Sequence, residues 1–239
     1  MKIPVMLLLF LFISCKNDSS KNIRMNTEPR TKWEGDKPGS SKDSITEFFN
    51  DSLNIGVEGK HRVELKRIIG KDSIYADIRF FEKQNGTWVE KQHFALQKDG
   101  VTGCDPEFKD FNNDGFKDLT YKPAVSARGA NDIRNLFLFD PKLGKLKLIK
   151  NSPDYPNLQY NEKLGCIDAF AVYGGSTSYF LKIDSDTLRQ FARIDLFEGY
   201  REVYKINKYG KETLVKREPF QTSYLRYKNF DPLEEYEEF

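Results

Sequence analysis

The sequence predicts an all-β protein, an antiparallel meander that forms a sandwich or a propeller-like domain. Short apolar or alternating runs recur at similar spacing between turn residues, which is the pattern of paired strands. Phe and Tyr are unusually frequent, with 19 and 12 residues, and both pack well on the pleated surface of a sheet. No stretch carries a long apolar period of 3.6 residues, so helices are expected to be scarce.

The first expected elements come before residue 100. The best helix candidate in the chain is Ser44–Leu53, although it is short. Further along, Asn85-Gly86 is a strong signal for a two-residue hairpin turn. Strands are therefore expected on both sides of that turn and just before it, at Arg62–Ile69, Ser73–Glu82 and Thr87–Leu96.

The other expected strands fill the rest of the domain, which is predicted to span residues 45–228. Turn residues such as Gly174-Gly175 separate them. They lie at Leu119–Val125, Ile133–Phe139, Lys145–Ile149, Ile167–Tyr173, Ser178–Ile183, Leu188–Leu196, Tyr200–Ile206 and Thr213–Lys216. The acidic tail, residues 229–239, is expected to fray.

The first 14 residues read as a signal peptide. Lys2 is followed by the apolar run Val5–Ile13, which is shorter than the roughly 20 residues of a membrane-spanning helix. The end of this segment, Phe12-Ile13-Ser14-Cys15, resembles the lipobox of bacterial lipoproteins. That resemblance implies acyl chains on Cys15 and an outer-membrane lipoprotein, on the periplasmic face or the cell surface. Ordinary cleavage that leaves a free Cys15 is the alternative.

Residues 15–44 combine the cysteine with a polar stretch rich in Asn, Ser, Lys, Pro and Gly. Such a composition buries too little apolar surface to offset the entropy of ordering the chain. We expect a flexible tether between the lipid anchor and the domain.

The stretch Asp110–Leu119 predicts a calcium site. Oxygen-bearing side chains occupy loop positions 1, 3, 5 and 9, and a glycine occupies position 6, where the turn needs a left-handed backbone. Calcium takes six to eight oxygen ligands. The expected ligands are Asp110, Asn112, Asp114, the backbone carbonyl of Phe116, and Asp118 directly or through water. A polar surface turn without metal is the alternative.

Two further cysteines, Cys104 and Cys166, lie within the domain. Outside the cytoplasm a disulfide between them is permitted, and two buried, inert thiols are the alternative.

Charge and catalytic motifs exclude some classes of function. The 38 Lys and Arg nearly balance the 36 Asp and Glu, which argues against a protein that binds nucleic acid by electrostatics. The two histidines have no signature neighbours, and no zinc or phosphate-loop spacing is present. We therefore expect a protein that is not an enzyme.

Residues 108–196 carry a resemblance to a known family. It rests on the calcium-type loop, on the following segment Ser126–Asn131, and on Leu136–Pro141 with Asn151-Ser152-Pro153 after it. This region resembles calcium-binding cell-envelope β-proteins that include immunity proteins against lysozyme-like type IV secretion effectors. Their fold is shared with periplasmic inhibitors of I-type lysozyme. Unlike the loop of an EF-hand, this loop has Tyr121 at position twelve and runs into an expected strand.

The resemblance implies that the protein binds and inhibits a lysozyme-like, peptidoglycan-degrading enzyme or another envelope protein. Calcium would make the loop Ala124–Arg134, next to the metal site, rigid for binding. The candidate partner-binding residues of that loop are Ser126, Arg128, Gly129, Asn131, Asp132 and Arg134. The alternative is a calcium-stabilised structural or glycan-binding surface module without inhibitory activity, with Trp88, Tyr155, Tyr160 or Tyr173 for sugar stacking.

Overall fold

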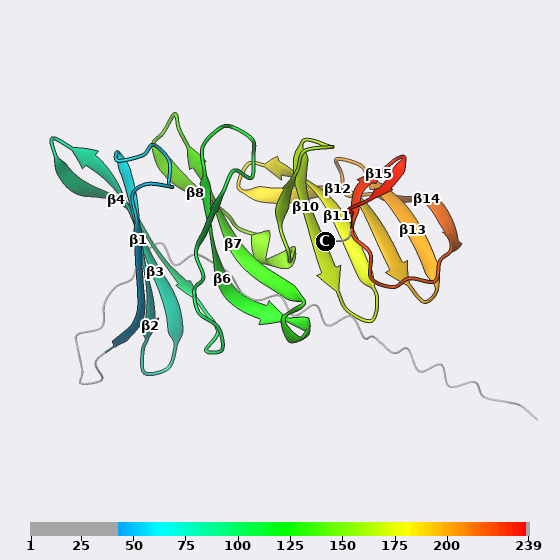
Figure 1. The fold of residues 1–239 in the computed structure, drawn as a ribbon, viewed down its shortest axis with the longest axis horizontal. Coiled ribbons are helices and arrows are strands. Elements are labelled where there is room, and N and C mark those ends of the chain that lie inside the picture. Colours follow the sequence, from blue (N-terminus) through cyan, green and yellow to red (C-terminus); the bar gives the residue numbers. More distant parts are fainter. Residues whose placement is uncertain (1–42, 238–239) are drawn as a thin grey trace, which may run out of the picture.

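The computed structural model describes residues 43–237 and confirms the all-β prediction (Figure 1). The described residues form sixteen strands in four antiparallel sheets, with two short 3-10 turns. No helix within them is long and apolar enough to cross a membrane. The predicted signal peptide, the lipidated Cys15 and the tether up to residue 42 lie outside the described residues, and β1 begins at Ser44, the last residue of the predicted tether.

Sheet A is a four-stranded meander in the order β1-β2-β3-β4. Its strands are β1 (Ser44–Asp51), β2 (His61–Ile69), β3 (Ile74–Gln84) and β4 (Thr87–Gln97). The helix prediction for Ser44–Leu53 is wrong, because residues 44–51 form a strand that pairs with β2. Ile45 and Phe48 remain 57% exposed there, so β1 is a solvent-facing edge strand rather than a core helix.

Sheet B repeats this arrangement in the order β5-β6-β7-β8. Its strands are β5 (Glu107–Lys109), β6 (Asp118–Ser126), β7 (Asn131–Asp140) and β8 (Lys145–Ile149). The 3-10 turn η1 (Ala127–Gly129) joins β6 to β7, and η2 (Ser152–Asp154) follows β8.

Sheet C contains six strands in sequence order. They are β9 (Gln159–Asn161), β10 (Cys166–Val172), β11 (Ser176–Asp184), β12 (Thr187–Phe197), β13 (Tyr200–Ile206) and β14 (Glu212–Pro219). A last hairpin follows, formed by β15 (Tyr227–Phe230) and β16 (Leu233–Glu235). The expectation that the acidic tail frays is therefore wrong as far as residue 237. Arg226 and Tyr236 flank this hairpin, and both bind the buried carboxylate of Asp168 on β10.

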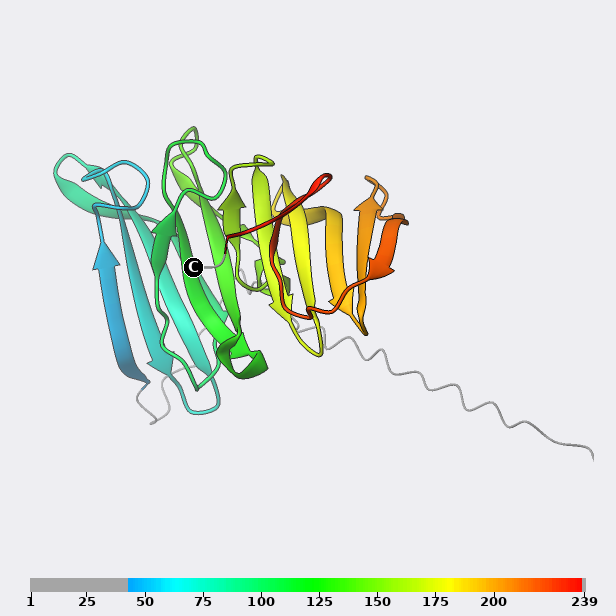
Figure 2. The ribbon, with the colours of Figure 1, turned by 45° about the vertical axis from the view of Figure 1, so that its right-hand side comes forward.

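The sheets stack as layers along the long axis of the molecule (Figures 1 and 2). Sheet B is buried on both faces, because side chains alternate along a strand. On β7, Phe137 and Phe139 join the core shared with sheet A, whereas Leu136 and Leu138 join the core shared with sheet C. A third core lies between sheet C and the C-terminal hairpin. Because sheet B is covered on both faces, its loops reach solvent at the two ends of its strands.

The two cysteines of the domain are free thiols. Cys104 lies in the core between sheets A and B, and Cys166 lies in the core beneath the C-terminal hairpin. A Cys104–Cys166 disulfide is thus not formed, because different layers hold the two side chains. Burial raises the pKa of Cys104 to about 11 and that of Cys166 to about 12, so both stay protonated and unreactive at neutral pH.

Candidate functional site

The loop between β5 and β6 is closed by its own side chains. Asp110 accepts backbone N–H bonds with both oxygens, from Asp114 at 3.2 Å and from Gly115 at 2.9 Å. Asp114 accepts the N–H of Phe116 at 2.9 Å and the side-chain amide of Asn112 at 2.9 Å. Gly115 has φ +87°, as expected for the glycine of this turn.

Asp118 anchors the loop to the interior. It is fully buried, and its two oxygens accept the backbone N–H groups of Phe111 at 2.8 Å and Phe139 at 2.9 Å. Burial raises the pKa of Asp118 to about 7, and the negative charges of Asp114 and Asp110 act in the same direction. The carboxylate thus fastens the end of the loop to β7.

The loop fits calcium by the chemistry of its donors. Carboxylate, amide and carbonyl oxygens are the ligands of hard cations, and a cation beside Asp118 would relieve the like charges there. Each carboxylate oxygen of Asp110, Asp114 and Asp118 already accepts a protein N–H group. Within residues 43–237, no group of three or more His, Cys, Asp or Glu side chains is gathered as for a metal ion. Calcium at Asp110, Asn112, Asp114, Phe116 and Asp118 stays a prediction.

The β6–β7 hairpin ends in an exposed tip, residues 126–130, with an unusual backbone. Ala127, Arg128 and Gly129 have φ values of +49°, +55° and +94°. The left-handed conformation costs a residue with a side chain about 1–2 kcal/mol, so the surroundings must hold the turn in place. Ser126, Arg128 and Gly129 of the predicted binding loop are thus presented to solvent.

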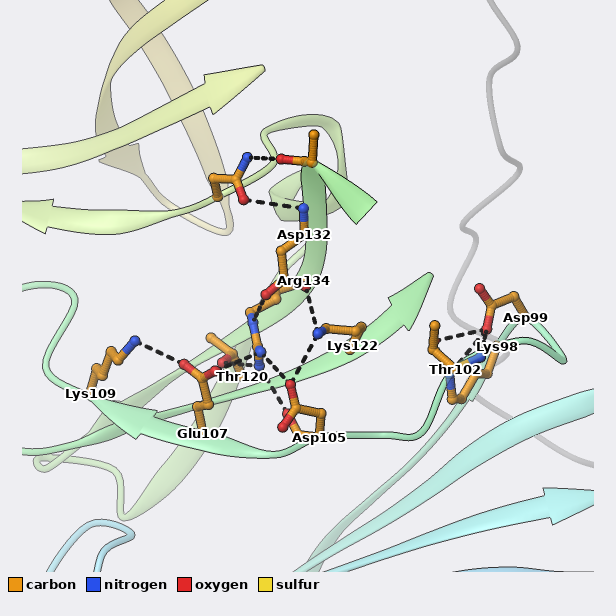
Figure 3. A network of polar contacts seen from close by, with 12 residues as sticks. Lys98, Asp99, Thr102, Asp105, Glu107, Lys109, Thr120, Lys122, Asp132 and Arg134 are labelled. Atoms are coloured by element: carbon orange, nitrogen blue, oxygen red, sulfur yellow. Dashed lines mark hydrogen bonds and ion pairs between the residues drawn. The ribbon is translucent and has the colours of Figure 1, made fainter. Parts of the chain in front are cut away.

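The base of the hairpin is held by a buried guanidinium (Figure 3). The side chain of Arg134 is 6% exposed and contacts Asp105 at 2.7 Å, Glu107 at 2.6 Å and Asp132 at 2.8 Å. Lys122 adds contacts to Asp105 at 3.1 Å and to Asp132 at 3.3 Å. Against the effect of burial, the hydrogen bonds from Lys122 and Arg134 hold the pKa of Asp105 below its ordinary value.

The structure places two of the predicted partner-binding residues, Arg134 and Asp132, at the base of the hairpin. Both belong to the support of the hairpin, and Arg134 is too buried and too fully paired to reach a partner. Sequence reasoning missed Asp105, Glu107 and Lys122, which lack a motif of their own.

Two asparagines tie the hairpin to sheet C. Asn131 is 8% exposed, and its amide both donates to the carbonyl of Val172 at 2.9 Å and accepts the N–H of that residue at 2.8 Å. Asn157 donates to the carbonyls of Ala130 at 2.8 Å and Phe170 at 2.7 Å. Asn131 is thus structural rather than partner-facing, and Asn157 is a further support that the sequence did not reveal.

The loop 110–118 and the tip 126–130 lie at opposite ends of β6 (Figure 1). Strand β6 runs from Asp118 to Ser126, and eight steps of about 3.3 Å separate its ends by roughly 26 Å. The expectation that the predicted calcium site lies next to the binding loop is therefore wrong. The tip is supported by Arg134, Asn131 and Asn157 instead.

The four aromatic residues considered for sugar stacking differ in exposure. Trp88 packs under the guanidinium of Arg62, whose carbon lies 5.0 Å from the ring centroid. Tyr155 packs against the core between sheets B and C, and Tyr160 is half-buried on β9. Tyr173, after β10, is 45% exposed. Of the four, Tyr173 is exposed, and the other three are half-buried.

Comparisons with known proteins give one distant structural likeness to report. No family model and no curated protein matches the chain. A solved structure described as "Structure of a Xanthomonas Type IV Secretion System related protein" is similar with a TM-score of 0.43 and 12% identity. The match covers 72% of this chain and 96% of that chain. At this level the similarity concerns the path of the chain alone.

Proposed function

We propose that the protein is a cell-envelope lipoprotein that binds and blocks a lysozyme-like, peptidoglycan-degrading enzyme through the tip of the β6–β7 hairpin. The observation that carries this proposal is the exposed left-handed tip on a buried, fully paired base. A binding loop that is already ordered loses less conformational entropy on association than a flexible one.

Arg128 is the residue of the tip that can bind acidic groups of a partner. Its side chain is exposed, whereas the acidic groups around Arg134 are occupied by Arg134 and Lys122. Glycosidases of the lysozyme kind carry a pair of catalytic carboxyl groups in a cleft. A guanidinium binds a carboxylate through two parallel hydrogen bonds, so Arg128 complements such a cleft.

The test asks whether the domain inhibits the lysis of peptidoglycan by lysozyme-like enzymes. The purified domain is mixed with a panel of lysozymes of different types and a muramidase effector, and lysis is followed by turbidity. We expect one enzyme to be inhibited, and Arg128→Ala to weaken that inhibition by about tenfold or more. Lys142→Ala, an exposed cation on the β7–β8 turn at the other end of β7, is the matched control and should leave inhibition unchanged. Undiminished lysis across the whole panel would exclude the proposal.

Calcium binding at loop 110–118 is a separate part of the proposal. A ligand that binds the folded state alone adds about 2.7 kcal/mol of stability at a hundredfold excess over Kd. Calcium should therefore raise the melting temperature of the wild type, a chelator should reverse the rise, and Asp114→Ala should abolish it. Equal melting temperatures with and without calcium in the wild type would identify the loop as a metal-free turn.

A further inference from the structure

One face of sheet C is uncovered over strands β12 to β14. Ile194, Leu196 and Val203 point into the core beneath the C-terminal hairpin. Because side chains alternate along a strand, Asp195 and Glu202 point to the opposite face. These two residues pair across β12 and β13, and Glu202 pairs with Arg217 on β14, so the three form one row across the sheet.

This row borders a hollow at the β12–β13 turn. The hollow has a volume of about 170 Å³ and is lined by Asp195, Phe197, Glu198, Tyr200, Glu202 and Arg217. Phe197 is 46% exposed and Tyr200 is 40% exposed. Two aromatic rings and four charged side chains thus meet in one shallow depression.

Most of the charged groups in the hollow are held in place. Asp195 accepts from Arg193 at 2.8 Å and from the hydroxyl of Thr177 at 2.7 Å. Glu202 contacts Arg217 at 3.2 Å, and the guanidinium of Arg217 lies 4.2 Å from the ring centroid of Tyr200. Fixed polar groups that retain free lone pairs and N–H groups can bind hydroxyls without first being ordered.

The chemistry of the hollow selects among ligand classes. A cationic ligand would need free carboxylates, but two of the three carboxylates already face a guanidinium. An anionic ligand would be repelled by Asp195, Glu198 and Glu202. We propose that this hollow binds a sugar ring of a neutral glycan, with Tyr200 and Phe197 both packed against the ring and the row of polar groups bound to its hydroxyls.

The surroundings extend the aromatic surface beyond one ring. The volume of 170 Å³ corresponds to the space of roughly six water molecules, which suits a single sugar residue. Next to it, the rings of Phe197 and Tyr173 lie with centroids 6.1 Å apart, and Tyr224 reaches the carbonyl of Tyr173 at 3.3 Å. An oligosaccharide would continue across these rings. Arg128 is not among the residues that line the hollow, and the proposal does not depend on enzyme inhibition.

The test is titration of the full-length protein with neutral oligosaccharides. Chitohexaose, cellohexaose, maltohexaose and mannohexaose are added separately, and binding is followed by NMR and calorimetry. We expect at least one of them to bind, and Tyr200→Ala and Phe197→Ala each to weaken that binding by about tenfold. Tyr209→Ala is the matched control, because Tyr209 is 83% exposed and lies at the other end of β13.

Three results would overturn the assignment. The first is that no sugar of the panel binds at millimolar concentration. The second is that Tyr209→Ala loses as much affinity as Tyr200→Ala while both variants keep the wild-type melting curve. The third is that a lysine-rich peptide binds the hollow in a salt-sensitive way and the sugars do not, which would assign a cationic partner.

Discussion

The two ends of β6 carry loops that are stabilised in opposite ways. At one end, Asp110 and Asp114 accept backbone N–H groups within their own loop, so that loop is largely self-contained. At the other end, the tip 126–130 has left-handed residues, and the groups that hold it lie outside the tip. Arg134 and Asn131 perform that task from the start of β7.

This difference shows what each end is suited for. A loop whose polar groups are mostly satisfied within it, with one buried anchor at Asp118, can be shifted by a local ligand such as a cation. A strained tip that is held from below stays ordered while its outer surface remains free for a partner. The predicted metal site and the proposed binding surface therefore lie at different ends of β6 and are held by different residues.

The largest expected effect is at the base of the tip. Arg134→Met removes a buried guanidinium and leaves Asp105, Glu107 and Asp132 without their main counter-charge. We expect a loss of about 3–5 kcal/mol in the free energy of unfolding, measured in urea. Arg128→Met, which changes an exposed cation of the tip, should cost under about 0.5 kcal/mol. Similar losses for the two variants would break the distinction between tip and base.

Within the loop, the buried and the exposed carboxylates should differ. Asp118→Ala leaves the buried N–H groups of Phe111 and Phe139 without an acceptor. We expect it to destabilise the metal-free protein by about 2–3 kcal/mol, and Asp114→Ala to have a smaller effect. Urea unfolding in a chelating buffer measures both. A larger effect of Asp114→Ala would show that the loop, rather than its anchor, carries the stability.

A glycine at each end provides a matched pair. Gly115 has φ +87° and Gly129 has φ +94°, and an added Cβ would meet nothing within 4 Å at either position. Substitution by alanine should therefore cost backbone strain alone, about 1–2 kcal/mol in each case. If loop 110–118 binds calcium, Gly115→Ala should also reduce the calcium-induced rise in melting temperature, whereas Gly129→Ala should not. An equal reduction in both variants would show that loop 110–118 and the tip 126–130 are energetically coupled.

The smallest expected effect is a pH dependence of the free energy of unfolding, which arises at His61 near loop 110–118. His61 is buried against Phe139, which also packs on Phe116 of the loop. Burial first, and then the charge of Lys60, lower the pKa of His61 below its ordinary value. The unfolded chain then binds a proton that the folded protein does not, so the contribution of His61 is complete above about pH 6.5 and is lost as the pH falls below it.

The comparison of wild type with His61→Asn isolates this group, because the other titrating residues cancel. Between about pH 7.5 and about pH 5.5, the wild type should lose on the order of 1 kcal/mol relative to the variant. Urea unfolding at the two pH values measures the difference. A difference that stays constant, or that grows in favour of the wild type on acidification, would contradict the assigned direction.

The fold was largely predictable because strand signals are local. The expected strands Lys145–Ile149 and Tyr200–Ile206 agree with β8 and β13 residue for residue. Ser44–Leu53 was misassigned because its apolar residues fit neither period well, and pairing with β2 decides its conformation. The C-terminal hairpin was missed for a similar reason, since its order depends on Asp168, which is 58 residues before Arg226.

Within the candidate site, the sequence predicted only those contacts that join residues close together in the chain. Asp110 to Asp118 form one motif, and the structure brings these residues into one loop. The bonds from Arg134 to Glu107 and Asp105 span 27 and 29 residues, and no spacing rule connects them. For this reason the sequence suggested a partner-facing arginine where the fold has a buried support.

Hydrogen exchange of two sets of backbone amides tests the separation of the two ends most directly. The tip is probed at Ala130 and Asp132, whose N–H groups bind Ala127 and Asn157, and the loop is probed at Gly115. Glu107→Gln weakens the support of Arg134 more mildly than loss of the arginine. We predict that this variant speeds exchange at Ala130 and Asp132 and leaves Gly115 unchanged. Faster exchange at Gly115 to the same degree, or no change at the tip, would contradict the account.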